Sequence, residues 1–143
     1  MNRVAVVYWS GTGNTESMAK AVAEGAQKAG VPEVALLTVG EAVPGIVGTV
    51  DAVALGCPAM GAEVLEESEM EPFVAALTAD SLQGKPVLLF GSYDWGDGTW
   101  MREWGERMKG LGAKVLAELP VKLDPKEEDL ARCREAGALL AGN

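Results

Sequence analysis

The sequence contains no histidine, and that absence bears on several functions at once. Histidine is the commonest general base in enzymes and the commonest protein ligand of transition metals. Catalysis by a serine–histidine pair and zinc-dependent hydrolysis are therefore not expected. We predict a protein without a metal site.

Cysteines and long apolar runs are scarce as well. Cys57 ends an apolar run and Cys133 falls on the apolar side of a helical pattern, so we expect packed thiols rather than a disulfide framework. No apolar run approaches the roughly 20 residues that span a membrane, and the first residues lack the cleavage pattern of a signal peptide. These features predict a soluble, cytoplasmic protein that does not enter a membrane.

Lysine and arginine are missing from a long middle segment. Residues 29–84 contain nine acids and no base, whereas the rest of the chain holds twelve of each, so the whole net charge of −9 arises in that segment. Such a one-signed surface aids solubility and steers a basic protein partner toward it. Binding to nucleic acid through phosphate contacts is disfavoured by the same charge.

The chain of 143 residues, 48% of them apolar, is long enough for one compact domain over residues 1–143 and too short for two. Its apolar runs are near-continuous rather than alternating, which is typical of parallel strands covered on both faces. The five expected strands are Arg3–Trp9, Glu33–Val39, Val50–Cys57, Pro86–Ser92 and Lys114–Val121.

Helical patterns lie between these runs. We expect helices over 15–29, 69–79 and 99–110, and a last helix that begins at the N-cap Asp124; the first helix should bury Met18, Val22, Ala26 and Ala29. Alternation of strands and helices predicts a three-layer α/β sandwich with a parallel sheet. Ligands of such sheets bind at the carboxyl ends of the strands, where the strand order reverses.

The loop after the first strand reads "SGTGNT" at the start of a helix. Small hydrogen-bonding residues at a helix N-terminus suit a phosphate, because the first turn has free N–H groups and a positive dipole end. The spacing matches neither the dinucleotide nor the nucleoside-triphosphate fingerprint. The loop is therefore suited to one monoester phosphate, or it is simply a helix start with nothing bound.

Two further loops follow the third and fourth strands. "CPAMGAEVLEESE" places Met60 just after a strand, and "GSYDWGDGTW" displays Tyr93 and Trp95 among glycines and acids. An aromatic at that position offers a flat face to a planar ring, and Met60 can cover the opposite face. The alternatives are a plain surface turn for the first of these loops and a core role for Trp95.

These stretches carry a family resemblance. "YWSGTGNTE", "GCPAMGAEVLEESEMEPF" and "LFGSYDWGDGTWM" resemble, in order and spacing, the three FMN-binding loops of short-chain flavodoxins, the type found in anaerobic bacteria. The resemblance runs from about Val4 to Leu119, and the fifth strand lacks the insertion of the long-chain type. It implies a flavodoxin-like fold with strand order 2-1-3-4-5.

The resemblance also implies roles for single residues. The flavin ring would lie between Met60 and Trp95, Glu63 would accept the hydrogen bond of the ring N3–H, and the Gly61–Ala62 peptide would form a redox-linked turn. The expected phosphate loop is Ser10, Gly11, Thr12, Gly13, Asn14 and Thr15. The remaining expected contacts come from Cys57, Pro58, Ala59, Ser92, Tyr93, Asp94, Gly96 and Asp97.

By the same resemblance the protein is expected to be an electron carrier rather than an enzyme. It would shuttle non-covalently bound FMN between the neutral semiquinone and the anionic hydroquinone at low potential. Expected partners are redox proteins with basic docking surfaces, of the ferredoxin/flavodoxin reductase, 2-oxoacid oxidoreductase, hydrogenase or nitrogenase type, and a monomer is expected. The alternative is an FMN-dependent NAD(P)H:quinone or metal reductase on the same fold.

Overall fold

A computed structural model describes residues 2–60 and 64–142. Its sheet has five strands, all parallel, in the order β2-β1-β3-β4-β5, which confirms the expected architecture and strand order. The strands are β1 (Arg3–Tyr8), β2 (Glu33–Thr38), β3 (Ala52–Gly56), β4 (Pro86–Tyr93) and β5 (Lys114–Lys122).

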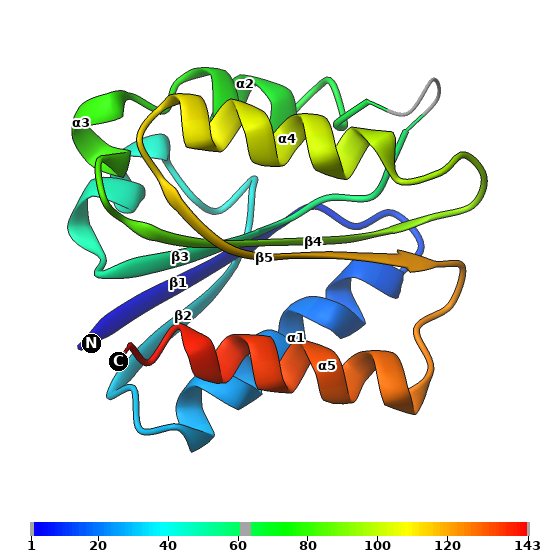
Figure 1. Cartoon of the computed structure of the whole chain (residues 1–143), viewed down its shortest axis with the longest axis horizontal. Helices are drawn as coiled ribbons and strands as arrows, with labels where there is room; N and C mark the ends of the chain where they lie inside the picture. The colour runs from blue at the N-terminus through cyan, green and yellow to red at the C-terminus, as the bar shows by residue number, and fades with distance from the viewer. Residues whose placement is uncertain (1, 61–63, 143) are drawn as a thin grey trace.

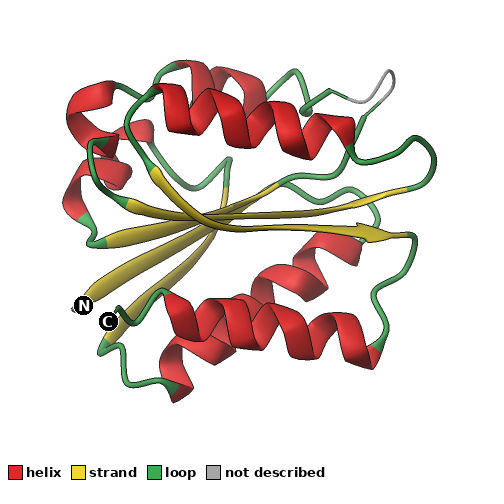
Figure 2. Cartoon of the chain, in the orientation of Figure 1, coloured by secondary structure: helices red, strands yellow, loops and turns green. Residues whose placement is uncertain are grey.

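Helices cover both faces of this sheet and make the three layers visible in Figure 1 and Figure 2. The two helices α1 (Asn14–Lys28) and α5 (Glu127–Leu139) pack together on one face. The opposite face carries η1 (Pro44–Thr49), α2 (Met70–Ala75), α3 (Ala79–Leu82) and α4 (Thr99–Gly110). No described helix is long and apolar enough to cross a membrane.

Burial explains why the apolar runs are continuous. Every residue of β3 is buried, as are most residues of β1 and β4, because side chains on both faces of these strands meet a helical layer. The edge strands β2 and β5 are only partly buried. The two layers of the core therefore lie on either side of the three central strands. The three loops that the sequence analysis singled out follow the carboxyl ends of these strands.

Three local expectations were wrong. The helix expected over 69–79 is split into α2 and α3 at residues 76–78, and the last helix begins at Glu127 instead of just after Asp124. Its first turn is closed by the Asp129 carboxylate, which accepts the Lys126 N–H at 2.9 Å. Ala29 lies beyond the end of α1 and is exposed, because the buried face of that helix ends at Ala26.

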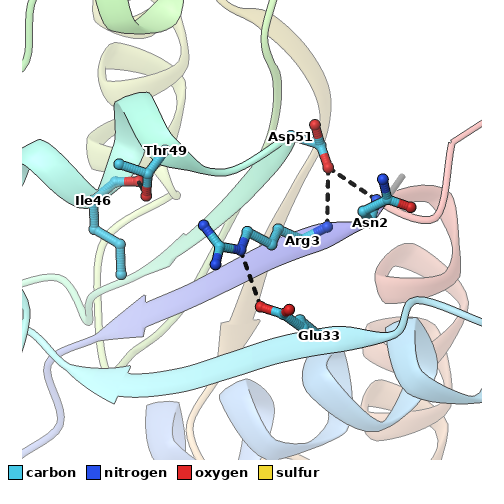
Figure 3. Close-up of polar contacts among 6 residues, drawn as sticks. All are labelled: Asn2, Arg3, Glu33, Ile46, Thr49 and Asp51. Atoms are coloured by element: carbon cyan, nitrogen blue, oxygen red, sulfur yellow. Dashed lines mark hydrogen bonds and ion pairs between the residues drawn. The ribbon is translucent and has the colours of Figure 1, made fainter.

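The amino ends of the strands are held by paired polar groups (Figure 3). Asp51 Oδ2 accepts the backbone N–H groups of Asn2 and Arg3, each at 2.9 Å, and Arg3 Nε lies 3.0 Å from Glu33 Oε2. Lys85 Nζ donates to the carbonyls of Val47 and, at 2.7 Å, of Val50. These polar groups at the amino edge of the sheet are therefore paired within the chain.

Candidate FMN-binding site

The loops after β1, β3 and β4 meet at the carboxyl edge of the sheet, at the right of Figure 1. They border an open depression with about 480 Å³ of free space. The strand order reverses at this point, since β1 is followed along the chain by β2 on one side and β3 on the other. The depression is lined by Trp9, Gly11, Thr12, Asn14, Pro58, Ala59, Met60, Ser92, Tyr93 and Asp94.

The first loop leads directly into the N-terminus of α1. Gly13, the N-cap residue, has a left-handed backbone with φ of 98°, which favours glycine, and no side chain caps the helix. The Ser10 hydroxyl accepts the Gly13 N–H at 3.0 Å and so shapes the turn. The first turn of α1 therefore presents N–H groups at the depression, and the lining includes no lysine or arginine.

Thr15 lies beneath the depression instead of lining it. Its side chain is buried, and its hydroxyl oxygen lies 3.3 Å from the Ser92 hydroxyl and 3.4 Å from the Ser92 backbone nitrogen. The start of α1 is thereby joined to the end of β4. This contact holds the first loop next to the third.

The second loop contributes Pro58, Ala59 and Met60 to the lining. Ala59 N–H donates to the Ser92 carbonyl at 3.0 Å, and Met60 and Val64 exchange two backbone hydrogen bonds of 2.8 and 3.0 Å. The ends of the segment are thus tied to each other and to β4. The predicted contacts Gly61, Ala62 and Glu63 lie outside the described residues.

Cys57 precedes the second loop but does not line the depression, and it is a packed thiol. Its side chain is fully buried, and burial raises the pKa of the thiol to about 12, so it is protonated at neutral pH. Its backbone carbonyl accepts the indole N–H of Trp100 at 3.3 Å. Its sulfur accepts the Glu66 N–H at 3.3 Å, so the thiol helps to hold the segment that follows the second loop.

A buried carboxylate below the second loop is a residue that sequence reasoning missed. Glu66 accepts the backbone N–H groups of Ser68, Glu69 and Met70 at 2.8 to 3.0 Å, together with the Ser68 hydroxyl. Burial by itself would raise the pKa of Glu66, but these hydrogen bonds outweigh it and leave the pKa lowered. Glu66 thereby fixes the segment that joins the second loop to α2.

The third loop separates its two aromatic residues. Tyr93 is half-buried and packs against Trp100, with ring centroids 5.4 Å apart, whereas 64% of Trp95 is exposed. Trp95 is thus not a core residue, and it stands beside the depression without lining it. Burial of Tyr93 and exposure of Trp95 leave a free indole face at this edge of the sheet.

Gly96 and Asp97 also lie outside the lining. Asp97 accepts the Thr99 hydroxyl and the Thr99 N–H, the latter at 3.2 Å, just where α4 begins. The Thr99 hydroxyl is the main cause of the lowered pKa of Asp97, followed by the Thr99 backbone. The Asp97 carboxylate therefore holds the start of α4 in place.

Trp9 lines the depression but was not among the predicted contacts. Its indole N–H donates to Glu69 at 3.2 Å, and a β-carbon at Gly11 would lie 3.1 Å from its ring. Glycine at position 11 thus lets the first loop pass close to the indole. An aromatic residue at the last position before the glycine-rich loop was the signal that could have found it.

The reversal of strand order places this chain among the doubly wound α/β proteins. Such proteins bind their ligands in a depression at this point, and helix N-termini are suited to phosphate groups. Comparison with known proteins narrows this class. The flavodoxin family model matches residues 6–137. The chain therefore belongs to the flavodoxin family.

Two relatives are similar over almost their whole length. The flavodoxin of Clostridium beijerinckii is 44% identical over 137 residues, which cover 95% of this chain and 97% of that protein. The flavodoxin of Megasphaera elsdenii is 44% identical over 138 residues, with coverage of 96% and 98%. The solved structure of two-electron reduced M. elsdenii flavodoxin superposes with a TM-score of 0.85 over 96% of this chain and 98% of that one, at 41% identity.

Proposed function

We propose that this protein binds one FMN non-covalently in the depression and serves as a low-potential one-electron carrier, with residues 1–143 acting as a single FMN-binding domain. When bound, FMN would supply the redox chemistry, which we propose uses the couple of neutral semiquinone and anionic hydroquinone. The observation that carries the proposal is the convergence of the loops after β1, β3 and β4 on one depression at the reversal of strand order.

The FMN phosphate would be held by the loop Ser10–Thr15 at the N-terminus of α1. In support, no side chain caps this helix, and the donors nearby are backbone N–H groups and neutral hydroxyls. Such a site binds a dianion through hydrogen bonds and the helix dipole, without a cation to neutralise it. The residues present therefore fit a monoester phosphate.

The flavin ring would lie beside the second and third loops. Met60 lines the depression and would cover one face, while the exposed indole of Trp95 would cover the other. Backbone groups near Cys57, Pro58, Ala59, Ser92, Tyr93 and Gly96 would contact the ring edge. Glu63 would accept the ring N3–H, with Gly61–Ala62 as the redox-linked turn.

Negative charge around the site would hold the potential of the bound flavin low. An unneutralised phosphate and the exposed Asp94 both oppose a further negative charge on the ring. One unit charge at about 6 Å with an effective dielectric constant near 20 costs roughly 3 kcal/mol. For a one-electron couple this corresponds to a shift of about −120 mV.

The same charge supports a choice of partner. With a net charge of −9 concentrated in residues 29–84, the protein would be steered toward redox proteins that present basic surfaces. The proposed partners are redox proteins with such surfaces, of the ferredoxin/flavodoxin reductase, 2-oxoacid oxidoreductase, hydrogenase or nitrogenase type. We propose that the carrier works as a monomer in the cytoplasm, without an enzymatic substrate of its own.

The test is an anaerobic dithionite titration of the purified protein loaded with FMN. We expect a yellow protein that turns blue, with a long-wavelength band, and bleaches only at a much lower potential. A colourless protein that refuses FMN would overturn the assignment of the site. Reduction in one two-electron step, together with direct oxidation of NADPH, would favour the quinone or metal reductase instead.

A further inference from the structure

Met60 differs from the other methionines in its burial. The sequence has six methionines, and the structure describes all of them except Met1. Four of the described methionines are core residues with at most 1% of their surface exposed: Met18, Met70, Met101 and Met108. Met60, by contrast, is partly exposed and lines the depression. Among the described methionines, its thioether is therefore the one that a small solute in water can reach.

The two thiols of the chain are protected in a way that the Met60 thioether is not. Cys57 and Cys133 are both fully buried, and burial raises the pKa of Cys57 to about 12 and the pKa of Cys133 to about 11. Oxidants attack the thiolate, so these protonated thiols react slowly. A thioether needs no ionisation before it reacts. Met60 is therefore the sulfur of the described residues that is most open to an oxidant in neutral solution.

The backbone at Met60 is anchored beside the depression. Met60 and Val64 exchange two hydrogen bonds of 2.8 and 3.0 Å, and the N–H of the preceding Ala59 donates to the Ser92 carbonyl at 3.0 Å. Ser92 is itself buried and lies against Thr15. An atom added to the Met60 sulfur would stay close to the depression, because the residue that carries it is held there.

Oxidation would change the chemistry of this wall. The second loop lines the depression with Pro58, Ala59 and Met60, whose side chains offer no hydrogen-bond donor. Methionine sulfoxide is polar, and its oxygen is a hydrogen-bond acceptor. Covering such an oxygen with a flavin ring, without a donor to satisfy it, is unfavourable.

We propose that Met60 is an oxidation site that controls the uptake of FMN: hydrogen peroxide converts Met60 to its sulfoxide in protein without FMN, and the oxidised protein binds FMN weakly. This inference rests on the proposed FMN site. In the reaction the sulfur gives two electrons to the peroxide, whose O–O bond breaks; one oxygen forms the S=O bond and the other leaves as water. Methionine sulfoxide reductases reverse the change, with a dithiol as the reductant and water as the product.

Bound FMN would protect the same residue. In the proposed complex the flavin ring covers the Met60 side chain, so that the sulfur is no longer open to solvent. The protein would therefore be sensitive to peroxide before the cofactor enters or after it leaves, and resistant while it is loaded.

The test exposes the apoprotein to hydrogen peroxide at neutral pH and follows the oxidation of each methionine by peptide mass mapping. FMN binding is then measured by fluorescence titration. Two variants are treated in parallel: Met60→Leu, which lacks the accessible sulfur, and Met101→Leu, which lacks a buried one. The urea unfolding midpoint of the apoprotein before and after treatment shows whether the fold is intact.

We expect Met60 to gain one oxygen atom about ten times faster than the buried methionines, and the FMN dissociation constant of the oxidised protein to rise about thirty-fold, with the unfolding midpoint unchanged. Methionine sulfoxide reductases with dithiothreitol should restore the original constant. Peroxide should leave Met60→Leu at its own untreated affinity, whereas Met101→Leu should lose affinity as the original does. FMN bound beforehand should slow the oxidation of Met60 about ten-fold.

An oxidised Met60 that leaves FMN binding unchanged would overturn the inference, and so would an equal loss of affinity in treated Met60→Leu. Oxidation of Met60 that is as fast with FMN bound as without it, or a loss of affinity that accompanies a lowered unfolding midpoint, would also contradict it. Failure of the proposed function is seen separately, because the untreated protein would then take up no FMN.

Discussion

The two ends of the sheet differ in how far their polar and apolar groups are satisfied within the fold. At the amino end, the Asp51 carboxylate and the Arg3 side chain are hydrogen-bonded within the protein (Figure 3). The Lys85 ammonium likewise donates to two backbone carbonyls. At the carboxyl end, α1 begins without a side-chain cap, and Trp95 and Leu123 are exposed. The first arrangement pairs polar groups within the fold, while the second leaves a helix end without a side-chain cap where we propose that FMN binds.

The carboxyl end is nevertheless closely packed beneath its surface. Beneath the open loops, the carboxyl ends of β3 and β4 approach so closely that a β-carbon at Gly91 would lie 2.0 Å from the Cys57 carbonyl oxygen. Thr15 and Ser92 join the two outer loops in the same region. The binding end is thus exposed at its surface and closely packed one layer below.

The largest effect should come from breaking that packed layer. Gly91→Ala forces backbone against a β-carbon, and we expect it to lower the free energy of unfolding by about 3 kcal/mol and to weaken FMN binding. Urea unfolding and fluorescence titration with FMN measure the two effects. The control is Gly45→Ala, where a β-carbon meets nothing within 4 Å, and which should change stability by less than about 0.5 kcal/mol.

The next largest effect should come from the amino end and leave FMN binding intact. Lys85→Met removes the donor shared by the Val47 and Val50 carbonyls, and we expect a loss of about 1–2 kcal/mol in unfolding free energy. The FMN dissociation constant should not change. Lys28→Met, at a side chain that is 74% exposed, should cost no more than about 0.5 kcal/mol. Weaker FMN binding in Lys85→Met would contradict the separation of the two ends.

Asp51 offers a sharper test, because its contribution depends on pH. The hydrogen bond from the Arg3 N–H, followed by that from Asn2, lowers the pKa of Asp51 in the folded protein. Its stabilisation is therefore complete above the unfolded-state pKa of about 3.9 and is lost as pH falls through the lower folded-state value. Asp51→Ala should have a lower Tm than the original protein at pH 7, and the difference should shrink toward pH 3. A difference that is constant with pH would mean that the charge is not involved.

The sequence predicted the strands and loops around this site better than the side-chain contacts within it. The five strands, their parallel direction and the three loops followed from continuous apolar runs and glycine-rich breaks, and they agree with the structure. The strand order came from the family resemblance and also agrees. The contact between Thr15 and Ser92 joins residues 77 positions apart, and no local pattern encodes such a pairing. Glu66 was hidden for a related reason: among neighbouring glutamates in "EESE", only the fold decides which one turns inward.

The smallest effect is expected at Trp104, which lies one helical turn from Trp100 in α4. Trp100 donates its indole N–H to Cys57 at the binding end, whereas the buried indole N–H of Trp104 has no hydrogen-bond partner in the described structure. Replacement by phenylalanine removes a hydrogen bond in the first case and an unsatisfied donor in the second. Both replacements also lose some packing volume.

We therefore expect Trp104→Phe to leave the free energy of unfolding within about 1 kcal/mol of the original, because relief of the unpaired donor offsets the lost volume. Trp100→Phe should cost about 1–2 kcal/mol and also weaken FMN binding, because the Cys57 carbonyl loses its donor beside the second loop. Urea unfolding of the apoprotein and FMN titration of each variant distinguish the two positions. Equal costs at both would mean that packing volume, rather than the hydrogen bond to Cys57, sets the role of Trp100.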